Sequence, residues 1–455
     1  MHMTSAIHGN APKAALFGMA LALLAPIASA GLALRVNSLE DNSPPGDGIV
    51  TLREAMQAIR SGQPTDLGDN PVGTSVIDLR ELSGEIELQS LLPRVDRAMH
   101  LLGPGRKVLA ISGGAEGGLR TRLLHVRQPG TLTIEGLELR NGLAQGGHGG
   151  GGQQRSGGGG GGAGVGGAIL VESGALALLS SRIRNSAARG GNGGSQTLPA
   201  GNEGGGGGGG IGGDGQTGSG LVGGSGGSGA PLASFVGAGG DANRPGGNSS
   251  EGAGAGGGSG CTTGIPCSAL TAFGGFAQFG GGGGGGGWAL VSGGVSPTGG
   301  DGGFGGGGGG RGGRLSASDG PGGLGGAFGG SGGASIAGGN VAGGGGGGAG
   351  LGGAVFMRAG SLLMEDVEFV GNRSERGLGG SHGSSGGPGQ GKAGALFIMD
   401  AADAVALRVR FIDNSATDAT GGGFTPGQAS DTGDVFGVLD SLDLFVDGFE
   451  ASTPD

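Results

Sequence analysis

The sequence predicts an all-β fold, a solenoid of short parallel strands with a capping helix at its N-terminal end and long glycine-rich insertions. Three observations predict this fold class. A pattern of apolar residues occurs four times, glycine dominates two tracts between its copies, and the N-terminal part has short apolar runs separated by turn residues. Repeats of this kind stack because none can bury its apolar face alone.

Composition and pattern divide the chain into segments. We expect one continuous solenoid from which the glycine-rich tracts loop out, so that Gly142 lies close to Gly166, and Ala187 lies close to Gly352. The segments are a signal peptide (1–30), the N-terminal cap and first coils (31–142), a Gly-rich loop (143–165), a coil (166–186), a Gly-rich low-complexity insertion (187–350), the C-terminal coils (351–420) and an acidic tail (421–455).

Residues 1–30 have the pattern of a secretory signal peptide. Lys13 is followed by an apolar run over 14–24, and Ala28-Ser29-Ala30 offers small residues for cleavage. The apolar run is shorter than the roughly 20 residues that cross a bilayer, and no later segment is long and apolar enough, so we expect no transmembrane segment. The sequence therefore predicts an exported protein, extracellular or at the cell surface, with the periplasm as an open alternative.

Composition restricts the partners. Of 455 residues, 130 are glycine, and the formal net charge is −10 with no basic tract, which argues against nucleic acid. With one tryptophan and no tyrosine, a carbohydrate platform of stacked aromatic rings is not expected. Cys261 and Cys267 lie close together in the sequence and predict a local disulfide in an oxidising compartment. Two thiols alone do not make a zinc site, and no histidine lies nearby, so we expect no metal at this pair. No cofactor is expected.

The N-terminal segment begins with a helix and continues as strands. Thr51 can cap a helix by accepting from the Glu54 amide, while the Glu54 side chain reaches back to the Thr51 amide. The apolar residues of 52–59 then share one face, and Ser61-Gly62 ends the helix. Because the following intervals are too short for crossover helices, we expect parallel strands whose open end the helix covers. These strands are expected at 76–79, 86–88, 99–102 and 108–111.

The repeat begins at a small residue and closes on asparagine. Its anchors are Gly130, Gly174, Gly360 and Ala402. Apolar residues stand two, four and nine positions after each anchor, and the ninth positions are Leu139, Ile183, Phe369 and Phe411. The closing residues are Asn141, Asn185, Asn372 and Asn414. The pattern predicts a strand, a bend and a second strand, with the phenylalanines stacked inside the coils. The asparagines are expected in left-handed corners, where their side chains can hydrogen-bond along the axis.

The glycine-rich tracts are expected to be flexible and solvated. Glycine loses the most backbone entropy on ordering, and these tracts offer little apolar area in return. A bundle of polyproline-II helices is the ordered alternative. It requires a three-residue register, which the tract keeps only in short patches.

Several motifs carry a resemblance to a known group of proteins. They are Gly166-Gly167-Ala168-Ile169, Gly352-Gly353-Ala354-Val355 and Ala393-Gly394-Ala395-Leu396 before the anchors, and Phe369-Val370-Gly371-Asn372 and Phe411-Ile412-Asp413-Asn414 at the ends of units. Together they resemble the repeats of chlamydial polymorphic outer-membrane proteins. The helix at 51–59 resembles the Cys-Ser-Leu-Arg-Glu-Ala motif of the same broad group, with Val50 and Thr51 in place of Cys and Ser. The resemblance implies a right-handed parallel β-helix and an adhesin-like role at a bacterial surface. The unit ending at Asn185 departs from it, with Ile-Arg-Asn in place of Phe-x-x-Asn.

A polysaccharide lyase or glycosidase-like enzyme on the same scaffold is the alternative. Such enzymes need carboxylates clustered on neighbouring coils. The candidates are Glu365, Asp366, Asp400, Asp403 and Asp413. His148 and the segment 182–184 faintly resemble the Gly-His-Gly and Arg-Ile-Lys elements of polygalacturonases, but the paired acidic motifs of those enzymes are missing.

We therefore expect a secreted or cell-surface, non-enzymatic β-helix protein, adhesin-like or structural in the envelope. No residue is assigned to catalysis, to a cofactor or to a metal. The expected partner is a host or surface glycan or protein, or a second copy of the chain. A third hypothesis is a matrix or ice-surface protein in which the glycine-rich tract is itself the functional element.

Overall fold

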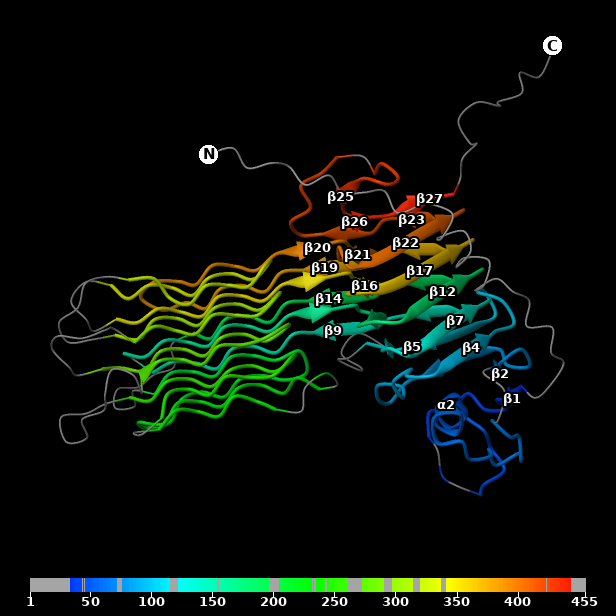
Figure 1. Cartoon of the computed structure of the whole chain (residues 1–455), viewed down its shortest axis with the longest axis horizontal. Coiled ribbons are helices and arrows are strands. Elements are labelled where there is room, and N and C mark those ends of the chain that lie inside the picture. The colour runs from blue at the N-terminus through cyan, green and yellow to red at the C-terminus, as the bar shows by residue number, and fades with distance from the viewer. Residues whose placement is uncertain are drawn as a thin grey trace, which may run out of the picture.

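The computed structural model describes residues 33–442 except 43, 45, 72–75, 115–121, 154, 196–203, 231, 233–234, 242–243, 261–271, 290–296, 314–319, 337–340 and 423. The expected signal peptide and the pair Cys261 and Cys267 lie outside the described residues. Figure 1 shows a stack of β-strands and a slab of side-by-side extended runs that projects from it. The described part is all-β apart from one helix, so the coarse fold class is confirmed.

The strands form five sheets, numbered I to V here, and every pairing is parallel except that of β25 with β26. Sheet I contains β1 (Leu34–Arg35), β2 (Val76–Asp78), β4 (Ala98–Leu102), β7 (Thr131–Glu135), β12 (Ala175–Leu179), β17 (Gly360–Glu365), β22 (Ala402–Leu407) and β27 (Asp440–Ser441). Sheet II contains β3 (Gly84–Glu87), β5 (Leu109–Ser112), β8 (Glu138–Arg140), β13 (Arg182–Arg184), β18 (Glu368–Val370) and β23 (Arg410–Ile412). Sheet III contains β6 (Leu124–Val126), β11 (Ile169–Val171), β16 (Val355–Met357), β21 (Leu396–Ile398), β26 (Val435–Val438) and β25 (Ala429–Asp431). Sheet IV contains β9 (Leu143–Gln145), β14 (Ala187–Arg189), β19 (Arg373–Glu375) and β24 (Ser415–Ala416), and sheet V contains β10 (Gly164–Val165), β15 (Gly350–Leu351) and β20 (Gly391–Lys392).

The strand register follows the sequence repeat. Leu176 pairs with Leu132 on one side and with Leu362 on the other. The pairing of β12 with β17 makes the coils on either side of the large insertion direct neighbours, as expected for a tract that loops out. At the first tract, Gly142 lies against Gly167.

The helix α2 (Leu52–Ser61) lies at the end of the stack where sheet I begins (Figure 1). Its start agrees with the first half of the sequence prediction, because the Thr51 hydroxyl accepts from the Glu54 amide at 3.2 Å. The second half is wrong, because the Glu54 side chain accepts from the Asp66 amide at 3.4 Å and not from the Thr51 amide. Its end is fixed by Gly62, whose φ of 74° is left-handed and whose amide donates to Ala58 O at 2.8 Å. The apolar face of α2 is buried in the same core as the strands.

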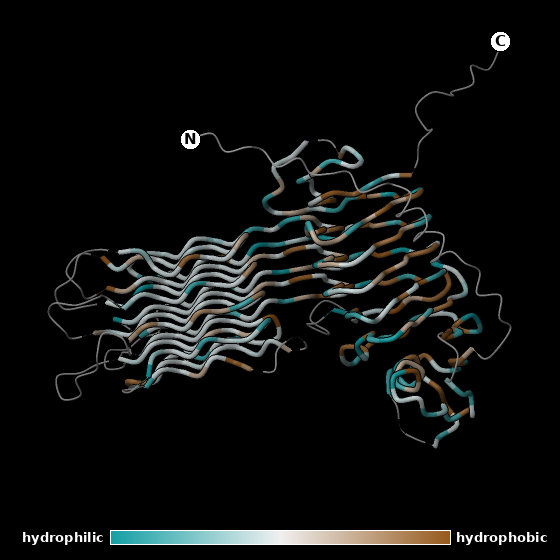
Figure 2. The backbone as a smooth tube through the Cα atoms, in the orientation of Figure 1, coloured by the Kyte–Doolittle hydropathy of each residue, from teal (hydrophilic) through white to brown (hydrophobic). Residues whose placement is uncertain are grey.

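The core lies between sheets I, II and III. Alternate residues of each strand point inward, so the apolar residues two, four and nine positions after each anchor meet their counterparts in the next coil. Phe369 and Phe411 stack with ring centroids 5.4 Å apart, as predicted. Figure 2 shows apolar residues along the strands of the stack, beside the paler glycine slab.

The described residues of the glycine-rich tracts form ordered, hydrogen-bonded runs, which corrects the expectation of flexible, solvated loops. In the run 156–163, successive amides donate to different neighbouring runs, with N···O distances of 2.8, 2.8 and 2.9 Å from Gly160 to Gly283, from Gly161 to Gly346 and from Gly162 to Gly147. Residues 157–159 donate to the same three runs. A period of three residues, with all hydrogen bonds between runs, is that of packed polyproline-II helices. The sequence keeps the three-residue register only in short patches, but each polyproline-II run is itself short, so a short patch is enough to form one run.

The slab is formed by three excursions of the chain, which leave three successive coils on the same side. Each excursion leaves after a strand of sheet IV and returns into a strand of sheet V (Figure 1). The excursions span 146–163, 190–349 and 376–390. The third excursion was missed in the sequence, where 351–420 was assigned wholly to coils.

A second apolar cluster joins the slab to the stack. The outward residues of sheet III are covered by phenylalanines at the inner ends of slab runs. Phe397 lies at the centre, with ring centroids 5.0 Å from Phe356, 4.6 Å from Phe436 and 5.4 Å from Phe328. These aromatic contacts fix the slab against the sheets.

Candidate functional site

The outward face of sheet II carries rows of charged residues. Strand alternation places the residues eight and ten positions after each anchor on this face, on either side of the inward ninth residue. In register, the eighth positions are Glu138, Arg182, Glu368 and Arg410, so that opposite charges alternate from coil to coil. Arg140 and Arg184 are neighbours at the tenth position.

These charges form a continuous network. Glu138 accepts from Arg184 at 2.8 Å and from Arg140 and Arg182 at 3.4 Å each, and its side chain is only 8% exposed. Arg182 also binds Glu368 at 2.6 Å, and the hydrogen bond from Arg182 lowers the pKa of Glu368. Arg140 also binds Glu85, and this hydrogen bond lowers the pKa of Glu85.

A cavity of about 290 Å³ lies in this face. We call it the arginine groove; the charged residues that line it are Arg106, Lys107, Glu138, Arg140, Arg182 and Arg184. Arg106 comes from the loop before β5, and its guanidinium reaches Asp366 at 3.0 Å and Glu368 at 3.5 Å. Lys107 is exposed and makes no ion pair within the described part of the chain. The groove therefore collects five cationic side chains around one buried carboxylate.

A second cavity, of about 510 Å³, lies where sheet III meets the slab. This junction cavity is lined by Arg127, Gln128, Glu172, Ser173, Glu251 and Arg358. Arg127, Glu172 and Arg358 each follow a strand of sheet III directly, whereas Glu251 comes from the slab. Arg358 binds Glu251 at 2.8 Å and lies over the Phe279 ring, 4.3 Å from its centroid.

Buried ionisable groups lie beside the junction cavity. His125 is fully buried on the outward side of β6, and its Nε2 lies 3.2 Å from a Glu172 carboxylate oxygen. Burial lowers the pKa of His125, and the hydrogen bond with His125 lowers the pKa of Glu172. Arg122 is also fully buried, and desolvation lowers the pKa of its guanidinium to about 10.

The slab has side chains in transverse rows at its surface. In one row, each side chain accepts from the backbone amide of the next run: Asp214 from His148 at 2.7 Å, His148 from Asn192 at 2.9 Å, and Asn192 from Leu378 at 2.9 Å. Asn248 accepts from the Phe276 amide at 2.9 Å, and Asp301 from Leu324 at 2.7 Å, in the same manner. The His148 ring, which faintly resembles a polygalacturonase element in the sequence, thus holds two slab runs together.

The repeat asparagines fall into two groups. Asn141 and Asn185 have the expected left-handed φ, 58° and 52°. In the two later units the preceding residues take that conformation instead, Gly371 with φ 63° and Asp413 with φ 52°. The expectation of a left-handed corner is therefore wrong for Asn372 and Asn414, which lie one residue further on.

Asn372 and Asn414 instead form a hydrogen-bonded ladder along the stack. Asn372 Nδ2 donates to Asn414 Oδ1 at 2.9 Å, and Asn414 Nδ2 donates to Asp434 Oδ1 at 3.0 Å. Asn372 Oδ1 accepts from the Ser186 amide at 3.0 Å. This confirms the predicted hydrogen bonding along the axis. The ladder also includes the Ser186 amide and the Asp434 side chain, which were not part of the prediction.

The anchor glycines stand where backbones approach closely. Gly174 and Gly360 have φ of 106° and 97°, and a Cβ on Gly360 would collide with Gly174 O. A Cβ on Gly130 would collide with Val95 O. These positions require glycine for backbone reasons and contribute no side chain to a site.

The carboxylates proposed for glycan cleavage are not gathered into one site. Glu365 binds Arg408 at 2.6 Å, and Asp366 binds Arg106 at 3.0 Å. Asp403 lies in β22 beside Ser361, whereas Asp413 lies at a corner after β23. Within the described ranges, no group of three or more His, Cys, Asp or Glu side chains could hold a metal ion.

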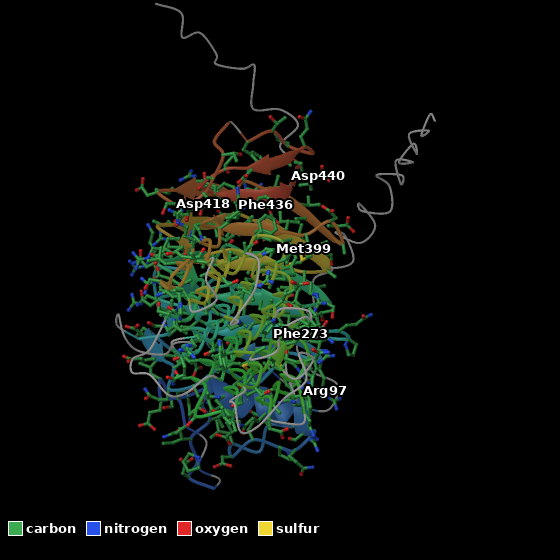
Figure 3. All side chains as sticks on the ribbon, turned by 90° about the vertical axis from the view of Figure 1, so that its left-hand side faces the viewer. Arg97, Phe273, Met399, Asp418, Phe436 and Asp440 are labelled. Carbon is green, nitrogen blue, oxygen red and sulfur yellow. The ribbon has the colours of Figure 1, made fainter. Side chains whose placement is uncertain are left out.

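Figure 3 views the molecule from the free end of the slab, with Asp440 and Phe436 toward the end of the stack that the chain reaches last and Arg97 toward the other. No family model, curated protein or solved structure matches the chain. Among the described residues, no helix has the length and apolarity needed to cross a membrane.

The charged face had a signal that the sequence analysis missed. The apolar positions define the repeat, and the ninth is predicted as a single buried residue. On either side of it, the eighth position alternates in charge through all four units, and the tenth position is arginine in the first two units. Aligning the polar positions in the same way would have placed Glu138, Arg182 and Glu368 in one row.

Proposed function

We propose that this is an exported, non-enzymatic protein, adhesin-like or structural in the cell envelope, which acts at the cell surface or outside the cell. The coils are inferred to form a right-handed parallel β-helix capped by α2, with repeats of the polymorphic outer-membrane protein type. Five sheets that each receive one strand per repeat, in constant register, support the solenoid. The sequence of residues 1–30 supports export.

The glycine slab is the observation that carries this proposal. It leaves the stack from the same side of three coils, and its described runs are hydrogen-bonded to their neighbours. Its surfaces present side chains in transverse rows fixed by backbone contacts. A rigid projection with a regular surface is suited to contact with another large surface, because little conformational entropy is lost when it binds.

Fractionation of cells, combined with proteolysis of intact cells, tests the proposal. We expect the mature chain to begin at Gly31 and to be found outside the cytoplasm, where added protease reaches it. Cells without the protein are expected to adhere less to a host or abiotic surface, or to have a weakened envelope. An uncleaved chain confined to the cytoplasm would refute the proposal.

A carbohydrate-active enzyme is the second candidate, and the junction cavity favours it. Glu172 and Glu251 both line this cavity, together with Arg127 and Arg358. Paired carboxylates are the groups that glycoside hydrolysis needs. A screen of acidic polysaccharides for reducing sugars and unsaturated products tests this candidate. Product release abolished by Glu172→Gln, with the fold intact by circular dichroism, would replace the first proposal.

A further inference from the structure

We propose that the arginine groove binds the carboxylate groups of an acidic polysaccharide, a polyuronate, that lies across the coils of sheet II. This inference rests on the proposed function, since a protein at the cell surface meets such polymers. The groove lies on the side of the stack formed by sheet II and is separate from the junction cavity.

The cations of the groove exceed what their protein partners can satisfy. Glu138 is shared by Arg140, Arg182 and Arg184. Each guanidinium has several N–H donors in a planar fork. Arg140 also binds Glu85 and Arg182 also binds Glu368, whereas among the described residues Arg184 donates only from its Nε, to Glu138. Donors on these arginines therefore remain for a ligand carboxylate, which guanidinium groups bind in a bidentate manner.

The arrangement of the cations matches an extended polymer. Arg140 and Arg184 stand at equivalent positions of β8 and β13, and adjacent strands are about 4.8 Å apart. Arg106 and Lys107 extend the cationic surface from the loop before β5. A polyuronate has a carboxylate on every sugar, so successive carboxylates of the polymer can bind successive cationic side chains of the groove. A single small anion would contact only one or two of these side chains.

The lining also distinguishes a polyuronate from a nucleic acid. The residues that line the groove include no aromatic ring for base stacking. Glu138 and Glu85 add acceptors beside the arginines, and sugar hydroxyls can donate to these acceptors. Double-stranded DNA has a higher charge density, with one charge per about 1.7 Å of helix axis, so these carboxylates and the net charge of −10 repel it more strongly than a polymer with one carboxylate per sugar.

Direct binding of polygalacturonate to the mature full chain tests the inference. Titration calorimetry at several salt concentrations is expected to show binding that weakens as salt rises, with dextran as the neutral polymer and polyphosphate as the phosphate polymer. The double variant Arg140→Gln/Arg184→Gln is expected to lose about tenfold or more in affinity. The matched control is Arg80→Gln, because Arg80 is an exposed arginine paired with Asp78 outside the groove, and it is expected to bind like the wild type.

Two further variants keep the test decisive if the double variant is unstable. Lys107→Gln leaves the ion-pair network intact and is expected to lower the affinity about threefold and to reduce the salt dependence. Glu138→Gln removes the carboxylate that competes with the ligand, so it is expected to raise the affinity. If the network of ion pairs were purely structural, Glu138→Gln would lower the thermal stability of the protein and would not raise its affinity for polygalacturonate.

Three results would overturn the inference: no polygalacturonate binding by the wild type at low salt, tighter binding of polyphosphate than of polygalacturonate, or equal affinities of the double variant and Arg80→Gln. The experiments also distinguish failure of the groove assignment from failure of the proposed function. A cytoplasmic protein that still binds polygalacturonate through the groove would refute surface action and leave the groove assignment standing. An exported protein that does not bind would refute only the groove assignment.

Discussion

Substitution of Gly162 by alanine is the sharpest test of the slab. Gly162 lies in the run 156–163, and its amide donates to Gly147 O at 2.9 Å. An added Cβ would lie 2.5 Å from Gly210 O and 2.9 Å from Gly209 O. Ordinary contacts begin near 3.4 Å, so the backbone of the neighbouring run would have to move by most of an ångström.

The cost of this movement follows from what the two carbonyls bind. Gly210 O accepts from Gly147 at 2.7 Å, and Gly209 O accepts from Gly282 at 2.8 Å. Overpacking of a dense interior costs about 1–3 kcal/mol, and each weakened hydrogen bond costs about 1 kcal/mol. Replacing glycine by alanine also lowers the conformational entropy of the unfolded chain, which stabilises the folded state by about 0.4–1 kcal/mol and offsets part of this cost. We therefore expect Gly162→Ala to lower the free energy of unfolding of the slab by about 3 kcal/mol.

Gly387→Ala is the matched control within the same slab. A Cβ at Gly387 would have its nearest neighbour, Ser331 N, at 3.5 Å. This variant is expected to be neutral or slightly stabilising. Denaturant unfolding and hydrogen exchange of the amides of 156–163 measure both variants. Equal stability and equal exchange in the two would refute the packed slab, because a solvated tract tolerates alanine at either position.

Three other predictions concern the stack and its junction with the slab. Asn372→Ala is expected to cost about 3 kcal/mol in denaturant unfolding, because it leaves buried backbone groups without partners; a loss below about 0.5 kcal/mol would contradict the ladder. Phe397→Ala is expected to cost about 3–5 kcal/mol and to open the junction to protease, whereas Phe276→Ala, at a side chain 54% exposed, is the control and should do neither. Burial holds the pKa of His125 below its ordinary 6.5, so the unfolded chain takes up a proton first as the pH falls. The free energy of unfolding should therefore decrease as the pH falls through 6.5 toward the lower native pKa, and His125→Gln should flatten this dependence; an unchanged pH profile in that variant would assign the effect elsewhere.

The sequence was sufficient for the strands because their side chains alternate. Leu132, Leu176 and Leu362 lie at the same repeat position and pair in register across the coils. Thr51 marked the start of α2 for a local reason, since its hydroxyl caps an amide only three residues away. Corners were less predictable, because Gly371 and Asp413 supply the left-handed turn that had been assigned to the following asparagines.

The slab could not be predicted in the same way. Glycine has no side chain, so the amino-acid sequence of a glycine run is the same whether the run is packed in a slab or exposed to solvent. The difference lies in which runs are neighbours, and Gly160 and Gly283 are brought together only by the packing of the whole tract. One signal was available, since surface runs place a side chain at every third residue, as at Val222, Ser225 and Ser228.

By itself, the sequence determined the parallel β stack, its repeat length and the looping out of the insertion. These depend on side-chain periodicity, which brings the same positions of successive repeats into register. Only the tertiary structure decided that the glycine tracts are a packed slab and that Arg140, Arg182 and Arg184 converge on Glu138. Both depend on contacts between segments distant in the chain. Such contacts gain their energy from backbone hydrogen bonds between runs and from desolvated charges, and these depend on which segments become neighbours in the folded chain.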